Sequence, residues 1–271
     1  MLEAALAALF GLLIGSFLNV CIHRMPRDES IVWPGSRCPS CRHPIAPYDN
    51  IPVVSWLLLR ARCRHCFTRI HWRYPLMEAL TASLFALAVL TWGPTAEALK
   101  YMLFSALCAA MFFTDLETRI LPDEFTLGGL YAGLALSATI PRKGLLLSIL
   151  APSISPPLAT LLDSALGAAF GSGLLWLIAK LYSAMRGREG LGFGDIKLVA
   201  MLGAFLGLAG AMAAILVGCV LGSVLGLAWI WLRQHTARNY ELPLGSFLAM
   251  AALLIAFQGE GLLNWYLRFA P

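Results

Sequence analysis

The sequence predicts an all-α polytopic membrane protein of about eight transmembrane helices, with a small zinc-stapled cytoplasmic loop domain. Two observations carry this prediction. Of the 271 residues, 59% are hydrophobic and 13% are charged, whereas soluble domains are about 45–50% apolar and about 25% charged. In addition, a polar loop of about fifty residues with two Cys-x-x-Cys pairs interrupts the apolar sequence after its first segment.

Apolar segments recur along the chain at lengths near the ~20 residues that cross a bilayer as a helix. The eight candidate spans are 4–22, 76–92, 98–114, 125–140, 159–183, 196–210, 211–232 and 244–266. The sixth and seventh run together through Gly207 and Gly210. The predicted domains are a first transmembrane helix (1–22), a cytoplasmic zinc-binding loop domain (23–75) and a transmembrane bundle (76–271).

The distribution of Lys and Arg predicts the orientation in the membrane. With the N-terminus outside and alternating spans, sixteen of the twenty basic residues fall inside, nine of them between Arg24 and Arg73. Such an excess is typical of cytoplasmic loops. We therefore expect a cytoplasmic loop domain and two periplasmic termini. We attribute the net charge of +5 to basic loops beside the lipid bilayer, which is the expected partner, and we do not expect nucleic acid to bind.

The loop carries four cysteines in two pairs, Cys38 with Cys41 and Cys63 with Cys66. Two residues between cysteines let one tight turn present both sulfurs to one ion, and zinc takes four such ligands in a tetrahedron. A loop of this size buries too little apolar surface to fold alone, so a metal would stabilise it. A redox or disulfide role is the alternative. Four cysteine ligands leave no open position, which predicts a structural zinc.

Two aspartates lie at predicted span boundaries. Asp115 closes the third span and Asp195 opens the sixth, so both are expected at the cytoplasmic edge of the membrane. Paired carboxylates can share general acid and base roles and cleave a peptide without a covalent intermediate. Each has a simpler explanation, a solvated interface charge for Asp115 and a helix N-cap for Asp195. Their common depth favours catalysis, with neither assigned a fixed role.

The residues around the aspartates suggest how a substrate would approach. Gly192 and Gly194 precede Asp195 and remove side chains where a substrate strand could approach the backbone. On the other side, Asp115, Glu117, Asp123 and Glu124 face only Arg119 in sequence. This acidic segment would suit a substrate with positive charge just inside the membrane.

Several short segments of the chain are distinctive: Gly-Ser-Phe-Leu-Asn-Val (15–20), Ile-His-Arg-Met-Pro (22–26), Tyr-Asp-Asn-Ile-Pro-Val-Val-Ser-Trp (48–56), Arg-Tyr-Pro-Leu-Met-Glu (73–78), Asp115 through Leu-Pro-Asp (121–123), and Gly-Leu-Gly-Phe-Gly-Asp-Ile-Lys (190–197). They resemble the bacterial type IV prepilin peptidases and occur in the order of that family, from about residue 11 to 206. Together these segments are highly specific.

The resemblance implies an inner-membrane aspartic endopeptidase that removes the short basic leader of type IV prepilins and type II secretion pseudopilins at the cytoplasmic face. It implies Asp115 and Asp195 as the catalytic pair and the four loop cysteines as zinc ligands. It also implies N-methylation of the new N-terminal residue with S-adenosylmethionine. Glu78 is a candidate polar contact for this donor, but the favoured interpretation of Glu78 is a carboxylate stabilised by a helix N-terminus. Many members have Gly where this chain has Ala61, which puts retention of methylation in question.

Other functions remain open at this point. A transporter or docking protein could use boundary carboxylates as a proton relay beside a zinc module, but it would favour carboxylates at mid-membrane depth and inverted repeats. A presenilin-like intramembrane protease shares the Gly-x-Gly-Asp pattern, yet it would require a deeper pair and would not explain the cysteine loop.

Overall fold

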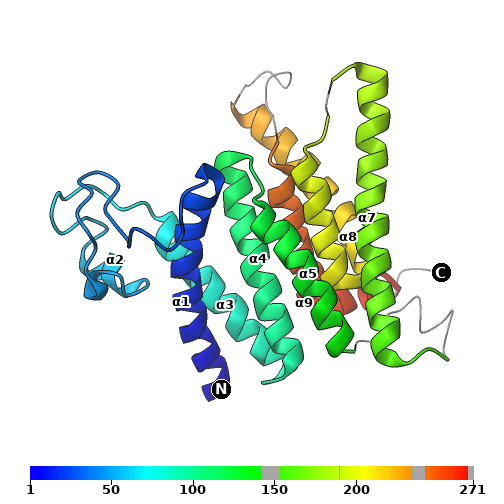
Figure 1. Ribbon diagram of the computed structural model, residues 1–271, viewed down its shortest axis with the longest axis horizontal. Helices are drawn as coiled ribbons and strands as arrows, with labels where there is room; N and C mark the ends of the chain where they lie inside the picture. The colour runs from blue at the N-terminus through cyan, green and yellow to red at the C-terminus, as the bar shows by residue number, and fades with distance from the viewer. Residues whose placement is uncertain (142–152, 189, 234–241, 268–271) are drawn as a thin grey trace. The chain divides into compact units, whose positions relative to one another are not determined.

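A computed structural model describes residues 1–141, 153–188, 190–233 and 242–267. Throughout these ranges the regular structure is helical, and β-pairing is confined to two isolated bridges in the loop after the first helix. The predicted all-α class is confirmed. Apart from two short 3₁₀ turns, the helices are α1 (Leu2–Arg24), α2 (Val54–Leu58), α3 (Arg73–Trp92), α4 (Ala96–Thr118), α5 (Asp123–Thr139), α7 (Pro156–Arg186), α8 (Phe193–Arg233) and α9 (Leu244–Leu267) (Figure 1).

The helices are those of a membrane protein. Within the described ranges, five segments are long and apolar enough to cross a bilayer: Leu2–Arg27, Arg73–Trp92, Ala96–Thr118, Pro156–Arg186 and Phe193–Ala228. With 17 residues, α5 extends only about 25 Å at about 1.5 Å per residue, less than the ~30 Å hydrocarbon core. The predicted count of eight spans is therefore not confirmed.

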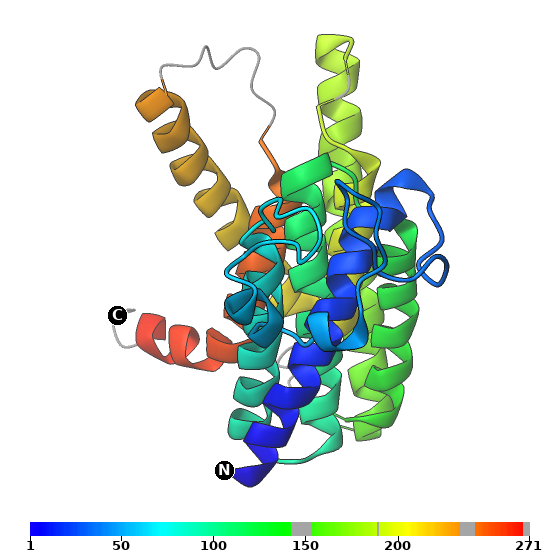
Figure 2. The ribbon, with the colours of Figure 1, turned by 90° about the vertical axis from the view of Figure 1, so that its left-hand side faces the viewer.

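Helix α8 contains the predicted junction of two apolar segments. Its backbone leaves the helical region at Gly207 (φ 74°, ψ −177°). In Figure 2 the later part of α8, coloured gold, runs toward the upper left. We predicted the division after Gly210; it lies at Gly207 because glycine adopts a positive φ without steric cost. The Asp163 side chain of α7 lies against Gly207 and accepts a long hydrogen bond of 3.5 Å from the backbone N–H of Leu208.

Residues Met1–Ala110 form one compact unit, and the antiparallel pair α1 and α3 is its framework. Glycines let the two backbones approach closely, as small residues do in membrane helices. A Cβ at Gly11 would lie 2.7 Å from Ala82 Cα, and one at Gly15 would lie 2.7 Å from Glu78 Cα. The cysteine loop is therefore held at both ends by helices in direct contact.

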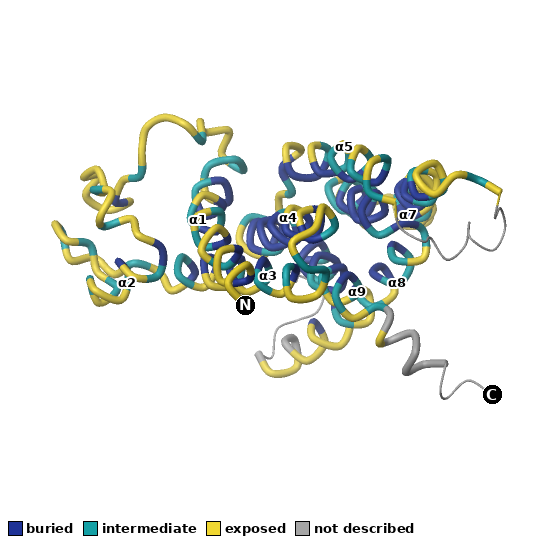
Figure 3. Tube along the Cα trace, turned by 90° about the horizontal axis from the view of Figure 1, so that it is seen from below, coloured by how far each residue is buried: buried dark blue, intermediate teal, exposed yellow. Residues whose placement is uncertain are grey.

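Residues Met111–Pro271 form the second compact unit, in which α8 packs against α5, α7 and α9. The first part of α8 is its most buried segment, with Leu198, Val199 and Met201 fully covered. Figure 3 shows buried residues along the inner sides of α5, α7 and α8. This packing fixes the N-terminal end of α8, where Asp195 lies. The predicted division at residues 22 and 75 stays a prediction.

Candidate active site and metal centre

Asp115 lies near the end of α4, and its side chain is buried. One carboxylate oxygen, Oδ2, accepts a hydrogen bond of 2.6 Å from the backbone N–H of Ser246 and lies 2.9 Å from the Ser246 hydroxyl. Ser246 is the third residue of α9, where N–H groups have no partner inside the helix. The carboxylate therefore caps α9 at the end where the helix dipole favours negative charge.

Asp195 is the third residue of α8 and is half-buried. Its backbone N–H donates to the carbonyl of Gly192 at 3.2 Å, which closes the turn that begins the helix. The negative charge of Asp115 acts on the Asp195 carboxyl, so the two predicted acids lie within electrostatic range in the same unit. Asp115 is enclosed and hydrogen-bonded, whereas Asp195 is the more accessible of the two.

Leu121, in the connection between α4 and α5, packs against the glycines near both acids. A Cβ on Gly194 would lie 3.2 Å from Leu121 Cβ, and a Cβ on Gly245 would lie 3.0 Å from Leu121 Cδ1 and 3.1 Å from Asp115 Cγ. The space beside Gly194, which we expected a substrate to use, is therefore filled by Leu121. Gly192 is exposed and remains open to an approaching chain.

The predicted acidic segment after Asp115 is partly neutralised by a residue far away in sequence. Lys197, one turn along α8 from Phe193, contacts both carboxylate oxygens of Asp123 at 2.6 and 2.8 Å. Its ammonium also lies 5.2 Å from the centre of the Phe193 ring. The expectation that the acids face only Arg119 is therefore wrong, because folding brings the start of α8 beside the start of α5. This partly exposed ion pair links the starts of the two helices.

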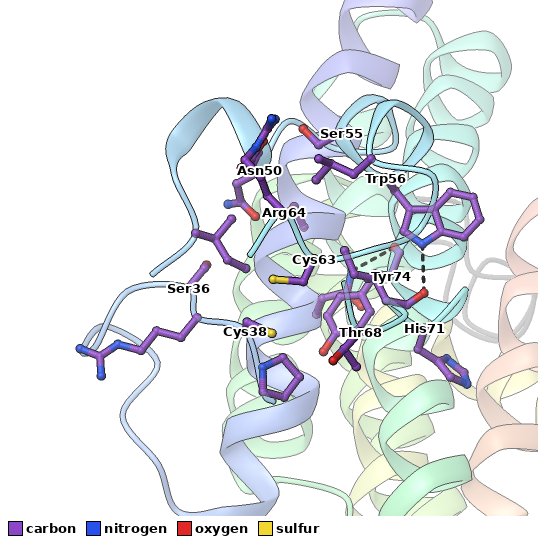
Figure 4. A pocket seen from close by; sticks show the side chains of 18 of the residues that line it. Ser36, Cys38, Asn50, Ser55, Trp56, Cys63, Arg64, Thr68, His71 and Tyr74 are labelled. Carbon is purple, nitrogen blue, oxygen red and sulfur yellow. Dashed lines mark hydrogen bonds and ion pairs between the residues drawn. The ribbon is translucent and has the colours of Figure 1, made fainter. Parts of the chain in front are cut away.

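The four loop cysteines form one cluster, with all four sulfur atoms within 4.8 Å of one another. Cys38 Sγ lies 3.7 Å from Cys66 Sγ. Thiolates about 2.3 Å from a tetrahedral zinc are about 3.8 Å apart, so the arrangement fits a zinc ion. Figure 4 shows the sulfurs of Cys38 and Cys63 directed into the same space. The four cysteines are expected to hold the ion in a closed, structural shell.

The two cysteine pairs sit in turns with the same hydrogen bonds. In the first, the N–H of Cys38 donates to His43 and the N–H of Ile45 donates to Ser36. In the second, the N–H of Cys63 donates to the carbonyl of Thr68, and the N–H of Ile70 donates to the carbonyl of Ala61. The residue after each pair, Arg42 (φ 57°) and Phe67 (φ 57°), is left-handed. Segments 36–45 and 61–70 thus repeat one knuckle on either side of the cluster.

Polar contacts stabilise the charged groups of the second knuckle. Thr68 Oγ1 lies 3.3 Å from Cys66 Sγ and lowers the pKa of that thiol, which favours the thiolate that binds metal. Arg64 donates hydrogen bonds to the Asp49 carboxylate from Nε at 2.8 Å and from Nη2 at 2.6 Å. These hydrogen bonds and the guanidinium charge hold the pKa of Asp49 below its usual value. The pair ties the knuckle to the segment before α2.

Two sequence profiles cover most of the chain. The profile of the Bacterial Peptidase A24 N-terminal domain matches residues 9–92, and that of the Type IV leader peptidase family matches residues 102–227. The chain belongs to the type IV leader peptidase family. The first matched range contains all four cysteines of the cluster, and the second contains both Asp115 and Asp195.

Relatives with the name prepilin leader peptidase/N-methyltransferase align over nearly the whole chain. The Aeromonas hydrophila protein is 36% identical over 97% of this chain and 93% of its own length. The Pseudomonas aeruginosa protein is 34% identical over 97% and 92%, and the Myxococcus xanthus protein is 39% identical over 83% and 63%. No solved structure matches. The chain is therefore an enzyme of a leader peptidase family whose relatives combine two activities in their name.

Ala61, where the family resemblance led us to expect glycine, has a left-handed backbone (φ 58°). Ala61 follows the end of α2. Its backbone N–H donates to the carbonyl of Trp56, and the N–H of Arg60 donates to the carbonyl of Leu57. These two hydrogen bonds form the Schellman motif that ends many helices. A side chain in this region costs about 1–2 kcal/mol relative to glycine. Alanine is therefore tolerated here with strain, and the knuckle keeps its hydrogen bonds.

Replacing Ala61 with glycine should stabilise the loop by about 1 kcal/mol, since relief of the strained φ exceeds the entropy that glycine adds to the unfolded chain. The measurement is the rate of limited proteolysis of the loop in the purified protein at increasing denaturant concentrations. Ala46→Gly is the matched control, because Ala46 has φ −66° in the same loop and should lose stability on this change. Equal effects of the two substitutions would contradict the strain at Ala61.

Local sequence patterns did not connect Ser246 or Leu121 with the Asp115 carboxylate, although Leu121 belongs to the segment 121–123 that resembles the family. A serine early in a helix usually indicates a cap, and Leu121 is an ordinary apolar residue. Both lie close to Asp115 only in the folded chain. Ser246 also lies outside the two ranges that the family profiles match.

Proposed function

We propose that this enzyme cleaves the short basic leader from type IV prepilins, and from type II secretion pseudopilins, with Asp115 and Asp195 as the catalytic dyad. The observation that carries the proposal is the pairing of two carboxylates within electrostatic range, in a chain whose relatives are named prepilin leader peptidases. Their place at the ends of α4 and α8, instead of mid-helix, argues against a proton relay across the membrane.

The chemistry assigns complementary tasks to the two carboxyl groups. One takes a proton from a water molecule as the water oxygen attacks the scissile carbonyl carbon, and the other donates a proton to the carbonyl oxygen. Collapse of the resulting diol breaks the C–N bond, and the amine leaves with a proton from the dyad. The dyad exchanges protons as a unit, so neither aspartate has a fixed role. Ser246 holds Asp115 in place through this cycle.

The membrane setting completes the proposal. We place the protein in the inner membrane with eight spans, both termini periplasmic, and the loop of residues 23–75 and the dyad at the cytoplasmic face. The excess of basic residues in that loop supports this orientation. The Cys38, Cys41, Cys63 and Cys66 cluster would hold a structural zinc. The names of the relatives support N-methylation of the new N-terminal residue, and S-adenosylmethionine would supply the methyl group.

The test uses the purified chain in detergent with a prepilin substrate. Mass spectrometry should detect loss of the leader, and in the presence of S-adenosylmethionine a gain of one methyl group on the mature N-terminus. A reaction without the donor should give cleavage alone. If several prepilins and pseudopilins remain intact with folded enzyme, the proposed peptidase function is wrong; cleavage without methylation would refute only the second activity.

Ser246→Ala should lower kcat for cleavage about ten-fold with little change in KM. The substitution removes the hydroxyl from Asp115 but leaves the backbone N–H, and a hydrogen bond to a charged group contributes about 1.5–3 kcal/mol. Steady-state kinetics on a prepilin peptide measures both constants. Ser246→Thr keeps a hydroxyl and should restore most of the rate. A serine needed only for packing would give similar kcat values in both variants.

A further inference from the structure

The first unit contains a cavity of about 380 Å³ between the cysteine loop and the helix pair α1 and α3. Its lining comes from the second half of α1, from the loop and from the start of α3, and it includes Cys38 and Cys63 of the cysteine cluster (Figure 4). Trp56 and Tyr74 border it, and the Trp56 indole N–H is fixed by a hydrogen bond of 3.2 Å to Ile70. Cavities of about 300–1,000 Å³ with aromatic and a few polar groups are typical of small-molecule sites.

Asn19, on the wall contributed by α1, has an acceptor without a partner. The side chain is 2% exposed, and its Nδ2 donates to the Tyr74 carbonyl at 3.1 Å. This hydrogen bond fixes the orientation of the Asn19 amide, because a flipped amide would place its Oδ1 against the Tyr74 carbonyl oxygen. Among the described residues, Oδ1 of Asn19 is a buried side-chain oxygen with no hydrogen-bond partner. A buried acceptor of this kind is costly unless a water, an ion or a ligand donor satisfies it.

Glu78 lines the same cavity from α3 and is 7% exposed. Its Oε2 accepts a 2.7 Å hydrogen bond from the N–H of Val53, a residue held at φ 60°. Ser16 also interacts with this carboxylate, and Ser16 and Asn19 share one face of α1 because they are three residues apart. The described residues provide no ion-pair partner for Glu78. Asn19 on α1 and Glu78 on α3 thus contribute hydrogen-bond acceptors to the lining of the same cavity.

We propose that this cavity is the methyl-donor site, with Asn19 and Glu78 binding the α-ammonium group of S-adenosylmethionine. An ammonium carries three N–H donors and a positive charge, and so satisfies both the free Asn19 oxygen and the Glu78 carboxylate. The nucleoside would lie toward the loop, beside Trp56. The inference rests on the proposed methylation and adds the residues that bind the donor.

The test is equilibrium binding of radiolabelled S-adenosylmethionine to the purified full chain without pilin. Glu78→Gln keeps an oxygen for the Val53 N–H but removes the charge, and Asn19→Ala removes the free acceptor. Each should weaken binding about ten-fold or more, because hydrogen bonds to charged groups are about twice as strong as neutral ones. Glu97→Gln, on the first turn of α4 and outside the cavity lining, is the control and should bind normally. Zinc content and thermal unfolding report on the integrity of each variant.

The outcomes separate this inference from the function on which it rests. If the wild type neither binds the donor nor methylates cleaved prepilin, the proposed methylation is wrong. If the wild type binds the donor and folded Glu78→Gln binds it equally well, the site is elsewhere and the inference is overturned. Intact donor binding with weakened binding of a mature pilin N-terminal peptide would likewise overturn it, by assigning the two acceptors to the amine of the methyl acceptor.

Discussion

Asp115→Asn and Asp195→Asn should each reduce prepilin cleavage by at least about 100-fold. Positioned acid and base groups contribute about 10²–10⁴ to rates, and neither amide can take or give the proton that the reaction requires. The carboxyl group of Asp195 lies within electrostatic range of Asp115, so each substitution removes half of the same proton-transfer unit. Single-turnover cleavage, read as loss of the leader by mass spectrometry, measures the effect.

The control for these variants is Asp28→Asn, which removes an exposed carboxylate on the turn after α1, outside the compact unit that holds Asp115 and Asp195. Asparagine also tolerates the left-handed backbone of this residue (φ 55°), so this variant should cleave at nearly the normal rate. Asp115→Asn also keeps an oxygen for the Ser246 N–H, so loss of folding should not mimic loss of catalysis. Substantial cleavage by either folded Asn variant would remove that residue from the dyad.

Local patterns predicted the parts of this protein whose chemistry depends on neighbouring residues. The cysteine spacing predicted one cluster because each pair needs only a single turn, and the four sulfurs do come together. The matching arginine, cysteine and isoleucine positions of segments 36–45 and 61–70 were also visible in the sequence. These shared positions indicate that the two ten-residue segments adopt the same knuckle, which the spacing of the cysteine pairs alone does not indicate.

Contacts between distant segments were not predictable in this way. Ser246 lies 131 residues from Asp115 in sequence, and Lys197 lies 74 residues from Asp123. Each pairing follows from how helix ends meet in the folded unit, which no local period encodes. The same reason explains Gly194: its role in packing against Leu121 depends on a connection far away in sequence, whereas its pattern suggested a substrate path.

Cys63→Ser should release zinc from the protein and unfold the loop between residues 36 and 70. Structural zinc contributes about 10–16 kcal/mol to the folding of small zinc-binding domains, and the loop has little else to hold it. Its two knuckles bury few apolar side chains, and both Ile45 and Phe67 are exposed. Metal analysis should find about one zinc per wild-type chain and a large loss in the variant, and limited proteolysis should cut the variant loop much faster.

Cys219→Ser is the matched control, because Cys219 is an exposed cysteine on α8, outside the cluster. It should retain zinc and resist proteolysis as the wild type does. Strong chelators should reproduce the Cys63→Ser pattern in the wild type, and added zinc should reverse it, since chelation removes only the metal and leaves all four cysteine ligands in place. Unchanged zinc content in Cys63→Ser would show that the cluster does not hold the metal. A loop that stays protected after complete loss of zinc would instead show that the contacts to α1 and α3, with the Asp49–Arg64 pair, suffice to fold it.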